Sequence, residues 1–208
     1  MLALDGFLIK LLGRLRARYE AAMLPIGRKL GKIGVTPNTI STISLLIAIL
    51  AAIAYASKAP VLGAVGLLGS GVVDMLDGSV ARATGLVTRF GAVYDPVLDR
   101  YAEFAVLFGI GYSGLVSWVW VVFSLFGMVM ASYVRARAES AGGLESCTVG
   151  IAERQEKIIL LLIGSLVQPF FNLALSIAVV IVGILSHATA AQRLHYTLKQ
   201  TAGRKVNV

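Results

Sequence analysis

Residues 61–112 read VLGAVGLLGSGVVDMLDGSVARATGLVTRFGAVYDPVLDRYAEFAVLFGIGY, two apolar stretches around a short polar centre. Asp74 and Asp77 stand near the end of the first stretch, and Asp95 and Asp99 near the start of the second. An acid at the centre of a bilayer costs about 2.5 kcal/mol or more, so acids inside membrane spans face a polar cavity or a partner. Four acids on two neighbouring apolar segments therefore need strong compensation.

The spacing of these acids predicts that the two pairs face one space. Asp74 and Asp77 are separated by three positions and Asp95 and Asp99 by four, so each pair lies on one face of a helix. Two antiparallel helices joined by a short turn would point all four carboxylates at each other. Hard cations with oxygen ligands neutralise such a cluster, and octahedral oxygen sites suit Mg²⁺ or Mn²⁺, with Ca²⁺ as an alternative. We therefore predict a metal site for two ions.

The residues between the acids fit a phosphate site. Gly78 and Gly91 remove side chains where a ligand or another backbone must come close. Arg82 follows Gly78 by one helical turn, and its planar guanidinium suits phosphate oxygens. In the alternative interpretation Arg82, Arg89 and Arg100 merely pair with the acids, which would neutralise at most three charges and leave the spacing of the acids unexplained.

The composition predicts an all-α integral membrane protein. The chain has 208 residues, of which 57% are hydrophobic and 14% charged, and its mean hydropathy is +0.82. A membrane-spanning helix needs ~20 mostly apolar residues. Six segments meet or approach this length, at 39–57, 61–83, 92–112, 115–137, 157–168 and 170–190. The fifth is short and runs into Pro169, so 157–190 is also compatible with a broken hairpin or one long helix.

An N-terminal helix is expected to lie in the lipid headgroup layer before the first span. Apolar and aromatic residues recur there at helical spacing, with basic residues mostly between them: Leu4, Leu8, Leu11, Leu15 and Tyr19. This pattern is typical of an amphipathic interfacial helix, and a soluble packing helix is the alternative.

The distribution of basic residues predicts the orientation of the chain. The net charge is +8, and with six crossings and a cytoplasmic N-terminus nearly all Lys and Arg fall on the inner side. Lys58 is the one basic residue in the presumed outer connections. Because topology accounts for the charge, we expect no nucleic-acid partner. The chain is predicted to cross the cell membrane with the aspartate motif facing the cytoplasm.

A complete family signature runs through the aspartate motif. The pattern D-x2-D-G-x2-A-R-x8-G-x3-D-x3-D is met at Asp74, Asp77, Gly78, Ala81, Arg82, Gly91, Asp95 and Asp99. It resembles the signature of the CDP-alcohol phosphotransferase family. The resemblance implies six transmembrane helices after a juxtamembrane amphipathic helix, a homodimer, and an active site near the cytoplasmic face. We accordingly expect a juxtamembrane segment at 1–34, a six-helix catalytic domain at 35–192 and a basic cytoplasmic tail at 193–208.

The resemblance also implies the reaction and the roles of the acids. Enzymes of this family transfer the phosphatidyl-type group of a CDP-linked lipid to an alcohol and release CMP. Asp74, Asp77 and Asp95 then bind metal, while Asp99 is both a metal ligand and the base that deprotonates the acceptor hydroxyl. The residues implied to contact the nucleotide or CDP-lipid are Pro37, Asn38, Thr39, Ile40, Asp74, Gly78, Ala81, Arg82 and Thr88.

A second stretch suggests the acceptor alcohol. Residues 132–139 (SYVRARAE) and 150–154 (GIAER) are similar to the branch that makes phosphatidylinositol phosphate or archaetidylinositol phosphate from L-myo-inositol 1-phosphate. Arg135, Arg137 and Arg154 would hold the acceptor phosphate by charge-assisted hydrogen bonds. The alternative is that they are ordinary inner-side flanking charges. Glycerol 3-phosphate is the alternative acceptor, and both diacylglycerol and archaeol donors remain open.

Two rival classes share some of these features. A membrane cation channel or transporter also carries acids inside its spans, but it leaves Gly78 and Arg82 unexplained. A membrane prenyltransferase also uses aspartates and Mg²⁺ on a diphosphate, but its motifs typically sit in two distant loops. Release of CMP from a CDP-lipid separates the predicted enzyme from a channel or transporter.

Overall fold

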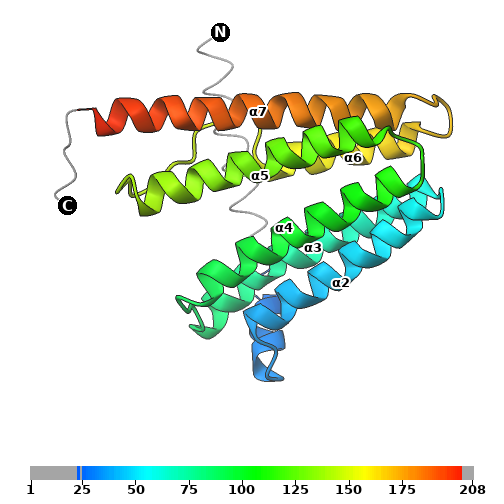
Figure 1. Ribbon diagram of the computed structural model, residues 1–208. Helices are drawn as coiled ribbons and strands as arrows, with labels where there is room; N and C mark the ends of the chain where they lie inside the picture. Colours follow the sequence, from blue (N-terminus) through cyan, green and yellow to red (C-terminus); the bar gives the residue numbers. More distant parts are fainter. Residues whose placement is uncertain (1–22, 24, 203–208) are drawn as a thin grey trace, which may run out of the picture. The chain divides into compact units, whose positions relative to one another are not determined.

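The computed structural model describes residue 23 and residues 25–202, and within these ranges it is helical and contains no strand. A short helical segment at 25–32 precedes the long helices. The long helices are α2 (Pro37–Ala56), α3 (Pro60–Thr84), α4 (Gly91–Tyr112), α5 (Trp118–Ser140), α6 (Arg154–Val167) and α7 (Ala174–Thr201) (Figure 1). The all-α prediction is confirmed for the described residues. The predicted interfacial helix with Leu4 to Tyr19 lies outside them, as does the end of the expected tail, 203–208.

Each of the six apolar segments predicted from the sequence corresponds to one helix. The region 157–190 forms two helices, α6 and α7, so the single-helix alternative is wrong. Pro169 cannot donate a backbone hydrogen bond, which favours a break at this point. The Gln168 side chain then bridges the turn, because its Nε2 donates to Asn172 O at 2.9 Å and its Oε1 accepts from Leu175 N at 2.9 Å.

The boundaries of α2 and α3 follow from proline and glycine chemistry. Pro37 and Pro60 are the first residues of the two helices, where a missing N–H costs nothing. Thr36 precedes α2 and its Oγ1 accepts a hydrogen bond from Thr39 N at 3.2 Å, which is an N-cap. Helix α3 ends before Gly85, whose φ of 70° suits a residue without Cβ.

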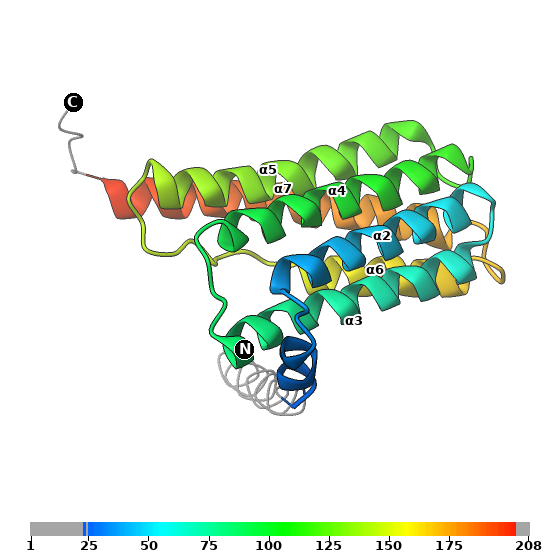
Figure 2. The ribbon, with the colours of Figure 1, turned by 90° about the horizontal axis from the view of Figure 1, so that it is seen from below.

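The chain forms two compact units. Among the described residues, unit 1 comprises those up to residue 47 and residues 69–101, and unit 2 comprises residues 48–68 and 102–202, so α2, α3 and α4 contribute to both. In unit 1, Ser44 Oγ donates to Ser70 O at 3.0 Å, which joins α2 to α3. The segment 25–32 lies beside the C-terminal end of α3 (Figure 2), where a Cβ on Gly27 would stand 2.8 Å from Ser79 O. Glycine at position 27 therefore permits this close approach.

Unit 2 is built on α7, which packs against both α5 and α6 (Figure 1). Gly183 of α7 allows close contact with α5, since a Cβ there would lie 2.6 Å from Ser124 Oγ. Ser124 Oγ in turn donates to Val179 O at 2.6 Å. Small residues and interhelical hydroxyl bonds are typical of helices packed in lipid.

The helices expose apolar side chains to an extent that fits a membrane protein. Within the described residues four helices, α2, α3, α5 and α7, are long and apolar enough to cross a bilayer. In each of these helices, only 22–44% of an apolar stretch of 18 residues is buried inside the protein. Helix α4 carries Asp95, Asp99, Arg100 and Glu103, and α6 has 14 residues, which explains why neither meets the same criterion.

Candidate active site

The four aspartates of the motif lie on two consecutive helices of unit 1. Asp74 and Asp77 lie on the C-terminal half of α3, and Asp95 and Asp99 on the first turns of α4. Thr88 fixes the start of α4, because its Oγ1 accepts a hydrogen bond from Gly91 N at 2.9 Å. The predicted helical hairpin is thus observed, and Thr88 has a structural role beside any contact with ligand.

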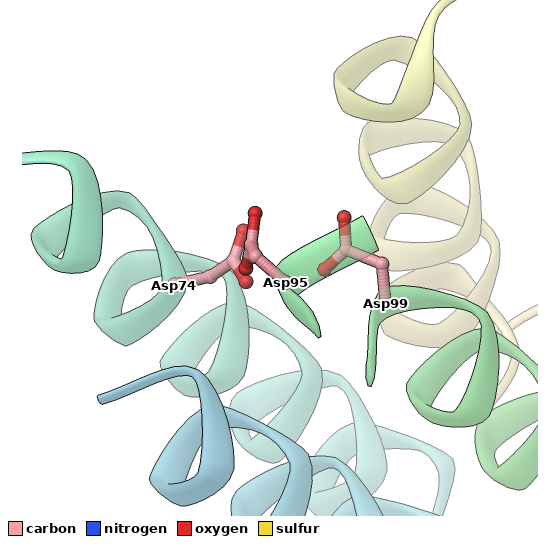
Figure 3. Close-up of side chains that lie close together, drawn as sticks. All are labelled: Asp74, Asp95 and Asp99. Carbon is pink, nitrogen blue, oxygen red and sulfur yellow. The ribbon is translucent and has the colours of Figure 1, made fainter. Parts of the chain in front are cut away.

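Three of the acids converge. Carboxylate oxygens of Asp74, Asp95 and Asp99 all lie within 4.8 Å of one another, and Figure 3 shows the three side chains close together. Oxygens on opposite sides of one Mg²⁺ are about 4 Å apart, so this spacing is close to that of a shared ion. Among the described residues, no group forms a hydrogen bond with the buried Asp95 Oδ1. A cation would satisfy this oxygen, so the donor set fits a hard divalent metal.

Asp77 is held differently from the other three acids. Its Oδ2 accepts a hydrogen bond from Ser41 Oγ of α2 at 2.8 Å, and its Oδ1 accepts one from Gly78 N. The Asp77 side chain also contacts Asp95. Ser41 is only 3% exposed, so this bond is sheltered from water. Asp77 therefore adjoins the three-acid group and is oriented by α2. The sequence analysis missed Ser41, because the register of α2 on α3 cannot be predicted from the motif.

The residues expected to contact the nucleotide occupy the same unit. Pro37, Asn38, Thr39 and Ile40 form the first turn of α2. Ile40 is 3% exposed and packs inside the protein, so its side chain serves the core. The Asn38 side chain borders α4, where a Cβ on residue 91 would lie 3.3 Å from Asn38 Oδ1.

Gly78 and Arg82 lie together near the C-terminal end of α3, where Arg82 is exposed. A Cβ on Gly78 would stand 3.3 Å from Arg82 Nη1, so glycine leaves room for the guanidinium beside the helix. Ala81, the small residue before Arg82, is partly exposed on the same helix. This placement agrees with a surface that a phosphate group approaches closely.

The three arginines predicted to bind the acceptor belong to unit 2. Arg135 and Arg137 lie near the end of α5, and Arg154 is the first residue of α6. Arg135 Nε donates to Glu139 Oε1 at 3.0 Å, and Arg154 Nε lies 3.8 Å from Glu103 Oε1. Two of the arginines thus face a carboxylate, whereas Arg137 is exposed.

Arg193 is a further buried arginine of unit 2. Sequence analysis placed it in the expected tail 193–208, whereas here α7 continues to Thr201 and Arg193 is 6% exposed. Its Nε donates to Val149 O at 2.9 Å, and its Nη1 donates to Ala131 O at 2.8 Å. The guanidinium therefore ties the segment before α6 to both α5 and α7.

Comparison with known proteins agrees with this geometry. Archaetidylinositol phosphate synthase of Pyrococcus horikoshii is 39% identical over 190 residues, which cover 91% of this chain and 98% of that protein. Phosphatidylinositol phosphate synthase of Mycobacteroides abscessus is 34% identical over 194 residues, covering 86% and 85%. The crystal structure of Mycobacterium tuberculosis phosphatidylinositol phosphate synthase with CDP-DAG bound matches with a TM-score of 0.81 and 30% identity, over 89% of this chain and 98% of that chain.

A second crystal structure of the Mycobacterium tuberculosis enzyme, in complex with manganese and citrate, matches with a TM-score of 0.75 and 32% identity, over 84% and 88% of the two chains. The model of the CDP-alcohol phosphatidyltransferase family matches residues 34–192, which include the whole aspartate motif and all three predicted acceptor arginines. Sequence, fold and motif agree, and the chain belongs to the CDP-alcohol phosphatidyltransferase family.

Proposed function

We propose that this protein transfers the phosphatidyl-type group of a CDP-linked lipid to L-myo-inositol 1-phosphate and releases CMP. The observation that carries the proposal is the convergence of Asp74, Asp95 and Asp99 within 4.8 Å. Relatives named archaetidylinositol phosphate synthase and phosphatidylinositol phosphate synthase support the acceptor, and the relative with CDP-DAG bound supports the donor.

Asp74, Asp95 and Asp99 would hold Mg²⁺ or Mn²⁺, with Asp77 completing a site for two ions. The fit rests on carboxylate chemistry, on their spacing and on the unsatisfied Asp95 Oδ1. The manganese in the relative's crystal structure supports a divalent ion. Such ions supply Lewis-acid stabilisation for the charge on a diphosphate and its leaving group. The protein contributes by orienting its acids, as Ser41 does for Asp77.

Asp99 is the proposed base. It would accept the proton of the acceptor hydroxyl while that oxygen bonds to the lipid-bearing phosphorus. The bond from this phosphorus to the bridging oxygen breaks, and CMP leaves with that oxygen. Asp99 is the last acid of the motif and lies on α4, whereas Asp74 reaches the cluster from α3. Asp99 would thus serve the acceptor as well as a metal ion, while the other acids act as ligands.

The nucleotide half of the donor would bind around α3 and the start of α2. Arg82 would pair with phosphate oxygen beside Gly78, where the absence of a Cβ permits close approach. Ala81 lies near the C-terminal end of α3, and Thr88 lies just before α4. Residues 37–40 form the first turn of α2. Asp74 would contact the donor as well as the metal.

The phosphate of the acceptor would be bound by Arg135, Arg137 and Arg154. Guanidinium groups bind phosphate by paired, charge-assisted hydrogen bonds. Arg137 is exposed at the end of α5 and is available to a ligand. Glu139 orients Arg135, and Glu103 lies beside Arg154.

We further infer six membrane crossings, with α4 and α6 joining the four long apolar helices, and a cytoplasmic active site. Helices α4 and α6 each lie in the chain between two helices that are long enough to cross. The charges of α4 lower its apolarity without removing it from the membrane, and α6 is short, with 14 residues. The even number keeps both ends of the chain on the cytoplasmic side, as the basic residues require. We expect residues 35–192 to be the catalytic domain and the assembly to be a homodimer in the cell membrane.

A panel assay tests the function. Purified enzyme with Mg²⁺ receives CDP-diacylglycerol or CDP-archaeol together with inositol 1-phosphate, glycerol 3-phosphate, inositol or serine, and CMP release is measured. We expect CMP release to depend on inositol 1-phosphate. Preference for glycerol 3-phosphate would replace the proposed acceptor. Cation flux into liposomes without any CMP release would indicate a transporter and would refute the enzyme proposal.

A further inference from the structure

The connection between α5 and α6 joins the segments that carry the proposed acceptor arginines. It runs from residue 141 to residue 153, between Arg137 near the end of α5 and Arg154 at the start of α6. Near its middle, Cys147 N donates to Glu139 Oε1 at 3.0 Å. Its second half is held by α7 through side chains that the proposed reaction does not otherwise use.

Thr189 and Gln192 of α7 bind the backbone just before Arg154. Thr189 Oγ1 accepts a hydrogen bond from Ala152 N and donates one to Ala152 O, both at 3.3 Å. Gln192 Oε1 accepts a bond from Ile151 N at 2.9 Å. The two α7 residues are three positions apart and so lie on one helical face. Thr189 is fully buried, so water cannot replace its bonds.

Gly150 shows how closely this backbone approaches α7. Its φ is 149°, a conformation that side chains rarely adopt, and a Cβ there would overlap Thr189 Cγ2. The methyl group of Thr189 thus packs against Gly150 while its hydroxyl holds Ala152. Arg193 adds a third attachment through its bond to Val149 O.

Arg154 follows this attached backbone by two residues. Between them, Glu153 N donates to Glu156 Oε2 at 2.9 Å, as part of a capping box that starts α6. The two residues directly before Arg154, Ala152 and Glu153, are therefore both held by hydrogen bonds to their backbone. The position of the Arg154 backbone is set by the contact with Thr189 rather than by the sequence around Arg154 alone.

We propose that Thr189 is a positioning residue for acceptor binding, which with Gln192 holds residues 151–152 against α7 and so preorganises Arg154 for the acceptor phosphate. The inference rests on the proposed function, in which Arg154 binds that phosphate. A ligand that finds its binding group already in place does not have to order it, so affinity is gained without any direct contact by Thr189. Loosening the backbone should weaken the acceptor and leave the CDP-lipid unaffected.

The test compares Thr189→Val with Thr189→Ser. Valine keeps the shape of threonine but removes both bonds to Ala152, whereas serine keeps the hydroxyl. Steady-state CMP release is measured while inositol 1-phosphate and the CDP-lipid are varied separately. We expect Thr189→Val to raise the acceptor KM about tenfold, with the KM for the CDP-lipid within about twofold of wild type. Thr189→Ser should restore the acceptor KM to within about twofold of wild type.

Ser124→Ala is the matched control, because Ser124 Oγ makes a buried bond between α5 and α7 that does not touch the connection. It should lower the melting temperature while the acceptor KM stays unchanged. An unchanged acceptor KM in Thr189→Val, or an equal rise for both substrates, would overturn the proposal.

If Thr189→Val does not fold, Gln192→Ala decides, since Gln192 is exposed, and its acceptor KM should rise about threefold. An unchanged acceptor KM in that variant would then overturn the proposal. The proposed function fails separately, when the wild-type enzyme itself releases no CMP with inositol 1-phosphate.

Discussion

The two units of the molecule obtain their functional side chains in different ways. In unit 1 the acids come from a motif of 26 residues on consecutive helices, α3 and α4, and three of them lie within 4.8 Å of one another where these two helices meet. In unit 2 the arginines stand on α5 and α6, and the backbone before Arg154 is bound by Thr189 of α7, which lies 37 residues after its partner Ala152. Local spacing can therefore specify a candidate metal site, whereas the surroundings of the proposed acceptor arginines depend on long-range contacts.

This difference predicts different kinetic consequences. Changes in unit 1 should act on turnover and on metal dependence, because its acids would bind the ions and take up the proton. Changes in unit 2 should act mainly on the KM for the acceptor. If variants of both units changed turnover and the acceptor KM in the same way, the two sets of residues would not have distinct roles.

The largest expected effect is removal of the metal. Because the clustered carboxylates would lose their counter-ions, chelation by EDTA should reduce CMP release to background. Added Mg²⁺ or Mn²⁺ should restore it, and Mn²⁺ binding can be followed by electron paramagnetic resonance. Magnesium-saturated EDTA is the control. Full activity in excess EDTA would contradict the proposed metal site.

Asp99→Asn should lower kcat by about a thousandfold, since asparagine cannot accept the hydroxyl proton. Binding of the CDP-lipid, measured by calorimetry, should persist because Asp74 and Asp95 remain. Glu145→Gln is the matched control, as Glu145 is an exposed acid of unit 2 outside the proposed site, and its kcat should equal that of the wild type. Turnover near the wild-type rate in Asp99→Asn would show that another group is the base.

Arg137→Ala should raise the KM for inositol 1-phosphate about thirtyfold, the size expected for one lost charged hydrogen bond. The KM for the CDP-lipid should not change. Lys199→Ala, which removes an exposed charge from the last turn of α7, controls for the general loss of positive charge. If the acceptor KM is the same in Arg137→Ala and wild type, the proposed basic pocket is wrong.

The length of the apolar segments predicted the bounds of α2, α3 and α4 well and those of α5, α6 and α7 less well. The expected bounds 39–57, 61–83 and 92–112 lie within two residues of α2, α3 and α4. Helix α5 begins and ends three residues later than expected. At its C-terminal end, the Arg135–Glu139 pair supports the helix beyond its apolar part. Apolarity marks contact with lipid, whereas helix ends are set by caps and polar pairs.

Helices α6 and α7 show the same limit. Helix α6 starts at Arg154, three residues before the expected start at 157. Its start is set by a capping box between Glu153 and Glu156, and both of these residues can be seen in the sequence. Helix α7 continues from the expected end at 190 to Thr201, with Gln192 and Arg193 bound to the preceding connection. No local sequence pattern predicts that Gln192 and Arg193 bind Ile151 and Val149, because these partners are some forty residues away in the sequence.

In the site itself, the motif predicted the helical hairpin and the meeting of the acids, but it placed all four acids in one shared space. The structure distinguishes Asp77, which is bound to Ser41 of α2, from the three acids that cluster. That distinction depends on how α2 packs against α3. Such a register is a property of the fold and cannot be read from the spacing within either helix.

Ser41→Ala should have the smallest effect, because Asp77 keeps its bond to Gly78 N when the bond from Ser41 Oγ is lost. A freed Asp77 would be less well oriented, so we expect the Mn²⁺ affinity and the Mg²⁺ dependence of CMP release to weaken about tenfold, the low end for residues that orient metal ligands. Ser44→Ala is the matched control on the same helix, since Ser44 Oγ bonds to Ser70 rather than to an acid. Both variants lose a sheltered hydroxyl, but only the first should change metal affinity. Equal metal affinities in the two variants would mean that Asp77 is positioned by its own helix and that α2 serves unit 1 only as packing.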